Sequence, residues 1–99
     1  MPTYVTLYKL TEQGIRNIRQ GPDRLQAATK AVEAAGGKLL SFYLTMGEYD
    51  YVIVSEAPND ETFASMTLAI GSLGNVRSTT MRAFTQQEYV NIIKKLPSV

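Results

Sequence analysis

The sequence contains no cysteine and no histidine. Without cysteine the chain forms no disulfide, offers no thiolate nucleophile and has no sulfur ligand for a metal. Without histidine it lacks the most common general base, the most common metal ligand and the usual proximal haem ligand. We therefore expect no metal site and no cofactor, and any proton transfer would depend on a carboxylate with tyrosine or arginine support.

The chain also lacks long apolar runs and a strong net charge. No apolar segment approaches the length needed to span a membrane, and the first residues do not have the basic-then-apolar pattern of a signal peptide. The formal net charge of +1 gives no general attraction to nucleic acid, and no nucleotide- or nucleic-acid-binding motif is present. We expect a cytoplasmic protein that binds neither membrane nor nucleic acid.

What is present predicts one domain over residues 1–99, with strands and helices in alternation. β-Branched and aromatic residues predict strands over 4–10, 39–46, 49–56 and 76–84. Helices are expected after Thr11, after Pro22, after Asn59 and after Thr85, where capping residues precede apolar stripes. The order β-α-β-β-α-β with a terminal helix is typical of the α+β, ferredoxin-like fold, an antiparallel sheet covered on one side by two helices.

The central hairpin sets the register of this sheet. If Gly47-Glu48 is a two-residue turn, Leu44 lies opposite Tyr51 and Phe42 opposite Ile53. Both faces of the hairpin are then largely apolar, with Leu39 on the face opposite Phe42. An uncovered sheet face of this kind favours association with a second copy, so we expect a homodimer or a larger homo-oligomer.

Asp50 is a carboxylate among strand residues, and two interpretations apply to it. It either binds a ligand or accepts a proton, or it accepts hydrogen bonds that hold the turn. Arg77 and Arg82 lie on opposite faces of the last strand by parity, and Arg82 is the one suited to hold a carboxylate or phosphate. The tyrosines are either core and interface anchors or the lining of a pocket for a flat organic ligand.

Three segments, residues 11–18, 42–50 and 73–84, resemble the GYD domain family, which is named for a Gly-x-Tyr-Asp motif matched here by Gly47, Tyr49 and Asp50. The resemblance covers nearly the whole chain. It implies a dimeric α+β barrel in small, mostly bacterial proteins, and it implies no activity. The motif is also similar to a hairpin in the effector domains of leucine-responsive-type regulators, which bind amino acids between subunits, although no helix-turn-helix precedes Tyr4.

These observations favour a small protein that binds an organic ligand in a regulatory or non-enzymatic role, in a pocket between sheet and helices or between subunits. The alternative is a cofactor-independent oxygenase or isomerase acting on an aromatic or quinone-like compound, by analogy with enzymes of the same fold. A purely structural or assembly role is a third interpretation. The residues predicted to bind the ligand are Tyr8, Tyr43, Asp50, Thr80 and Arg82.

Overall fold

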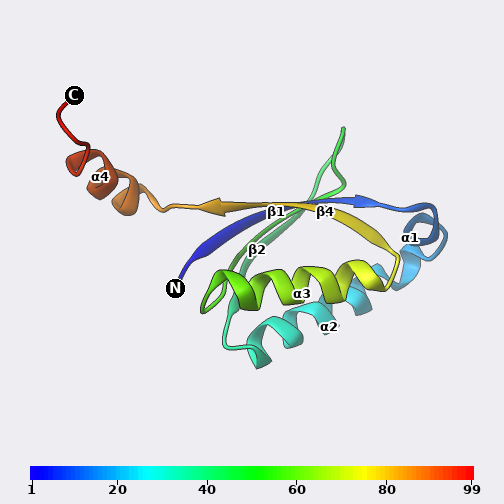
Figure 1. The fold of residues 1–99 in the computed structure, drawn as a ribbon. Helices are drawn as coiled ribbons and strands as arrows, with labels where there is room; N and C mark the ends of the chain where they lie inside the picture. Colours follow the sequence, from blue (N-terminus) through cyan, green and yellow to red (C-terminus); the bar gives the residue numbers. More distant parts are fainter.

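A computed structural model describes residues 1–99 and has one four-stranded sheet in the order β2-β3-β1-β4, with all neighbouring strands antiparallel. Helices α2 and α3 lie on one face of this sheet and leave the other face bare (Figure 1). The predicted α+β, ferredoxin-like fold is confirmed. The elements are β1 (Thr3–Leu10), α1 (Glu12–Arg16), the 3₁₀ turn η1 (Ile18–Gln20), α2 (Gly21–Ala34), β2 (Lys38–Leu44), β3 (Tyr51–Glu56), α3 (Asp60–Ser72), β4 (Val76–Ala83) and α4 (Gln86–Lys94).

The predicted helix caps are present and explain where three helices begin. The side chains of Thr11 and Asn59 accept hydrogen bonds from the backbone N–H groups of Gly14 and Thr62. Thr85 and Glu88 form a reciprocal capping box at the start of α4. The backbone hydrogen bond from Thr85 lowers the pKa of the Glu88 carboxyl. Each cap satisfies N–H groups that a helix leaves unpaired at its first turn.

The core lies between the sheet and the helices. Alternate residues of β1, namely Tyr4, Thr6 and Tyr8, are buried on the helix side. The ring of Tyr4 stacks on that of Phe63 from α3, with the ring centroids 4.1 Å apart, and Ala57 completes this cluster. Buried residues therefore alternate with more exposed ones along β1, as expected for a strand with one covered face.

The hairpin between β2 and β3 has the predicted register at its centre. Leu44 pairs with Tyr51 and Phe42 with Ile53, as the two-residue turn predicted. Both strands are shorter than predicted, however, because β2 ends at Leu44 and β3 begins at Tyr51. A register shift between Leu39 and Ser41 also inserts one extra residue, Leu40, which overturns the predicted face of Leu39. Leu39 lies on the helix side of the sheet, together with Ile53.

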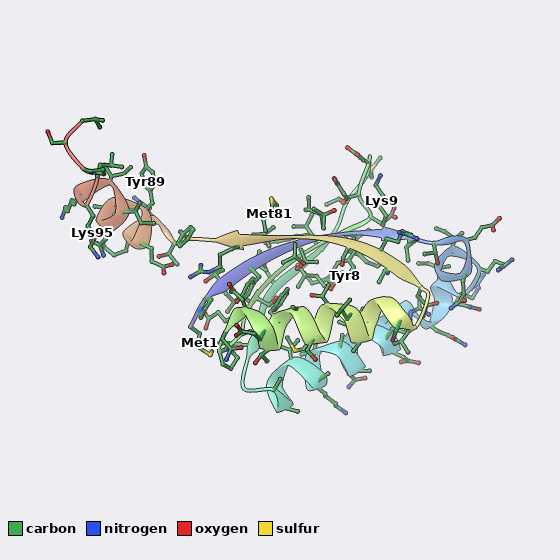
Figure 2. The ribbon with its side chains drawn as sticks, in the orientation of Figure 1. Met1, Tyr8, Lys9, Met81, Tyr89 and Lys95 are labelled. Carbon is green, nitrogen blue, oxygen red and sulfur yellow. The ribbon has the colours of Figure 1, made fainter.

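The opposite face of the sheet, here called the bare face, is uncovered in this chain. Figure 2 shows Lys9 and Met81 on this side, whereas Tyr8 lies toward the helices. Tyr43 is 62% exposed and Met81 46% exposed. By strand register, the apolar residues of the bare face are Val5, Leu7, Tyr43, Val52, Val54 and Met81.

Helix α4 stands apart from the rest of the chain. It follows β4 on a short extended segment and projects beyond the end of the sheet (Figure 1). The Cα radius of gyration is 15.3 Å, compared with about 13 Å for a compact chain of 100 residues. The molecule measures 53 × 31 × 19 Å along its principal axes, and the projecting helix α4 accounts for its elongated shape. None of the helices is both long and apolar enough to cross a membrane.

Candidate functional site

Asp50 holds the β2–β3 hairpin against the end of β1. Its carboxylate oxygen Oδ2 accepts a hydrogen bond from the backbone N–H of Leu10 at 2.8 Å, and its own N–H donates to the carbonyl oxygen of Tyr8 at 2.8 Å. Gly47, at the tip, has a φ of 116°, which glycine adopts without strain. These bonds match the interpretation in which the carboxylate holds the turn.

The five residues predicted to bind a ligand do not surround one space. Tyr8, Thr80 and Arg82 lie on the helix side of β1 and β4, and Tyr43 lies on the bare face. Asp50 is at the hairpin end, next to Tyr8. Arg82 pairs with Tyr4, near the other end of β1, so it is remote from Asp50.

Two of these residues have packing partners on the helix side. The hydroxyl oxygen atoms of Thr80 and Thr6 lie 3.3 Å apart, and burial raises the pKa of the Tyr8 phenol. The space between sheet and helices is an apolar cavity of about 30 Å³, which accommodates about two water molecules. An organic ligand does not fit there, because a space for about two water molecules is smaller than one aromatic ring.

Arg82 belongs to an aromatic cluster at the end of β4. Its guanidinium carbon lies 4.4 Å from the ring centroid of Phe84 and 5.9 Å from that of Tyr4, which are cation–π distances. The Tyr4 hydroxyl donates to the carboxylate of Asp60. Burial, reinforced by the bond to this carboxylate, raises the pKa of Tyr4 to about 12.

Two cations lie side by side at the other end of β4, where no site was predicted. Lys9 and Arg77 are directly opposite each other on neighbouring strands. Lys9 has partners in Glu48, at 3.6 Å from Nζ to Oε1, and in the ring of Tyr49, 5.3 Å from Nζ. Arg77 forms no salt bridge, so a pair of like charges is only partly compensated.

These cations line a shallow cavity of about 130 Å³. It combines positive charge, the hydroxyl group of Thr79 and one aromatic face, a set that suits a small anion with organic bulk. No cluster of carboxylates is placed to hold a metal ion. We call this space the Lys9–Arg77 cavity, and its lining residues are Leu7, Lys9, Tyr49, Arg77, Ser78 and Thr79.

Comparison with known proteins identifies the family. The sequence profile of the GYD domain matches residues 4–93. The chain belongs to the GYD domain family. A GYD-type relative from Thermus thermophilus bears the name glutamine synthetase and cystathionine beta-lyase binding protein. It is 30% identical over 95 residues, which are 95% of this chain and 100% of the relative.

A solved structure agrees with the GYD assignment at the level of the fold. The crystal structure of TTHA0845, also from Thermus thermophilus, has a TM-score of 0.55 and 24% identity, covering 86% of this chain and 95% of that chain. A more distant likeness is to a MhuD variant with two manganese protoporphyrin IX molecules per active site, with a TM-score of 0.46 and 15% identity over 87% of this chain and 97% of that chain. In this GYD domain the motif residues Gly47, Tyr49 and Asp50 form the hairpin that borders the Lys9–Arg77 cavity.

Proposed function

We propose that this GYD domain is a regulatory, non-enzymatic binding protein that holds a small organic anion in the Lys9–Arg77 cavity. The name of its Thermus relative, a binding protein for two enzymes, supports a regulatory role rather than catalysis. A carboxylate attached to an aromatic or apolar group matches the lining of the cavity. The ligand is still a small organic molecule, as the sequence predicted. The proposed site, however, is the Lys9–Arg77 cavity and not the five residues predicted from the sequence.

The single observation that carries this proposal is the unpaired guanidinium of Arg77 beside Lys9. Like charges placed directly opposite each other on neighbouring strands destabilise a sheet. An anion between the two side chains removes that repulsion and accepts charge-assisted hydrogen bonds from the guanidinium. The ring of Tyr49 and the side chain of Leu7 would contact the organic part of the ligand.

The assembly we propose is a homodimer formed through the bare face. The apolar residues of that face cluster on the middle strands, around Val5, Val52 and Val54. Covering them removes apolar surface from water at about 25 cal/mol per Å². The Lys9–Arg77 cavity lies at one end of the same face, in the polar rim of such an interface, where a second copy would deepen it.

The experiment compares phenylacetate with phenylacetamide, which has nearly the same shape and no charge. Isothermal titration calorimetry on the full chain should detect binding of the acid and none of the amide. Replacing Arg77 with glutamine (Arg77→Gln) should weaken binding of the acid about 10- to 100-fold, because a hydrogen bond to a charged group contributes about 1.5–3 kcal/mol.

The matched control is Arg16→Gln, which removes the same charge from an exposed residue of α1 that does not line the cavity. It should leave the affinity unchanged. Equal affinity for the acid and the amide, or equal loss in the two arginine variants, would contradict the proposed site. Native mass spectrometry of the protein from its own host then tests whether an anion is retained, and identifies it.

A further inference from the structure

Helix α4 carries an apolar stripe that nothing in this chain covers. Figure 2 shows Tyr89 on this helix and Lys95 directly after its last residue, both well away from the sheet. Tyr89 is 59% exposed and Leu96, just past the helix end, 63% exposed. Ile92 and Ile93 complete the stripe, since spacings of three and four residues share one helix face. Gln87, Asn91 and Lys94 lie on the opposite, polar face.

An isolated helix of this length does not persist in water. α4 has nine residues, and helices shorter than about 12–15 residues are marginal without tertiary packing. Its capping box satisfies the first N–H groups, yet it does not bury the stripe. α4 therefore requires a packing surface for its apolar face.

The short connection between β4 and α4 prevents α4 from packing on the sheet of its own chain. Only Phe84 and Thr85 separate β4 from α4. Thr85 is extended, with φ −66° and ψ 166°, because its side chain caps the helix. Phe84 is packed against the guanidinium of Arg82. To fold back onto the bare face, the chain would have to reverse direction within two residues, neither of which is glycine or proline, while Thr85 keeps the extended conformation that caps the helix.

The geometry points to a second copy as the partner of α4. We propose that α4 is an exchanged arm, which packs its apolar stripe on the body of the other copy while the partner's arm packs on this one. This inference rests on the dimer proposed above and adds a residue set to its interface. A two-fold interface makes such an exchange reciprocal, so both stripes are buried at once.

Two further observations favour a second copy. Figure 1 shows α4 and the β2–β3 hairpin tip both on the side of the sheet away from the helices, so they flank the bare face. The tip carries one exposed apolar side chain, Met46, which is 99% exposed. Lys94 and Lys95 form no salt bridge, whereas the stretch between Lys38 and Arg77 contains five carboxylates and no cation. Of these five, Glu56 and Glu61 form no salt bridge or side-chain hydrogen bond within the chain, so a second copy offers them to the basic end of α4.

Because the chain contains no cysteine, a single introduced cysteine can be labelled at one chosen position. The full-length variant Tyr89→Cys carries a single environment-sensitive fluorophore on the apolar stripe, and Asn91→Cys carries the same label on the polar face. Accessibility to iodide quenching is measured across a dilution series, with sedimentation equilibrium on the same samples. The label at position 89 should be shielded in the dimer and exposed on dilution, and the label at 91 accessible throughout.

Other outcomes overturn the inference. A dimer in which the label at 89 stays accessible means that α4 is free, and the proposed dimer stands without the exchange. A monomer with the label shielded places α4 on its own body. A monomer at every concentration removes both the exchange and the dimer.

A second pair of full-length variants tests the energetic contribution of the stripe without any label. Ile92→Asp places a charge on the stripe, and Asn91→Asp places the same charge on the polar face. Ile92→Asp should raise the Kd of the dimer about tenfold or more, and Asn91→Asp should leave it near the wild-type value. Equal Kd values for the two variants, with native circular dichroism spectra for both, would refute the exchange.

Discussion

Replacing Asp50 with alanine tests whether this carboxylate holds the hairpin on β1. The change removes the only side-chain acceptor of the Leu10 N–H, a bond of 2.8 Å between half-buried residues. Leaving a partly buried donor unpaired costs about 1–3 kcal/mol. For a domain of this size, each 1 kcal/mol lowers the Tm by about 4–8 °C. We therefore expect Asp50→Ala to unfold at a clearly lower urea concentration than the wild type.

The control is Asp50→Asn, which keeps an oxygen acceptor at the same position and loses the charge. The bond to the Leu10 N–H then persists in its weaker, neutral form, so this variant should lose less than about 1 kcal/mol. Urea denaturation followed by circular dichroism measures both variants, at one protein concentration because dimerisation adds to apparent stability. If Asp50→Ala is as stable as the wild type, the carboxylate does not hold the hairpin.

Two other predictions concern packing and ionisation. A Cβ atom on Gly14 would lie 2.1 Å from the carbonyl oxygen of Asn75, whereas one on Gly71 meets no atom within 4 Å. In urea denaturation, Gly14→Ala should therefore destabilise the fold by about 1–3 kcal/mol, and Gly71→Ala should stabilise it by about 0.5–1 kcal/mol; a reversed order would refute the packing. Because the pKa of Tyr4 rises from 10.0 to about 12, the neutral phenol contributes stability that is complete below pH 10 and is lost as the pH rises through 12. Because burial also raises the pKa of Tyr8, an ultraviolet titration should show a late phenolate that disappears in Tyr4→Phe and persists in Tyr8→Phe. A wild type that ionises in one step near pH 10 would contradict this prediction.

Most of the fold could be predicted because the local signals agree with one another. Thr11, Asn59 and Thr85 cap their helices as predicted, and the period of two in β1 identifies its buried face. The face of Leu39 was wrong because one extra residue in β2 exchanges the two faces of the strand beyond it. Such a bulge has no clear signal in a strand without glycine or proline.

The candidate site was harder to predict, because it depends on pairing between distant segments. Parity correctly placed Arg77 and Arg82 on opposite faces of β4. The position of Arg77 opposite Lys9 depends on the β1–β4 register, which no local turn sets. The expected strand order makes these two strands neighbours, but a shift of two residues would have separated the charges. The detachment of α4 likewise follows from the geometry after β4, whereas its apolar stripe was visible in the sequence.

The proposed anion site and the proposed dimer interface lie on the same face of the sheet, so anion binding and dimerisation can be thermodynamically coupled. The Lys9–Arg77 cavity lies at the rim of the bare face, and α4 would complete the interface that covers this face. If an anion binds more tightly in the dimer, each bound anion must tighten the dimer by the same factor, because the coupling free energy is reciprocal. Because a homodimer contains this cavity twice, saturating phenylacetate should lower the dimer Kd by the square of the ratio between the phenylacetate Kd measured below the dimer Kd and that measured above it. If phenylacetate leaves the dimer Kd unchanged and its own Kd is the same above and below that value, the cavity and the interface are energetically independent.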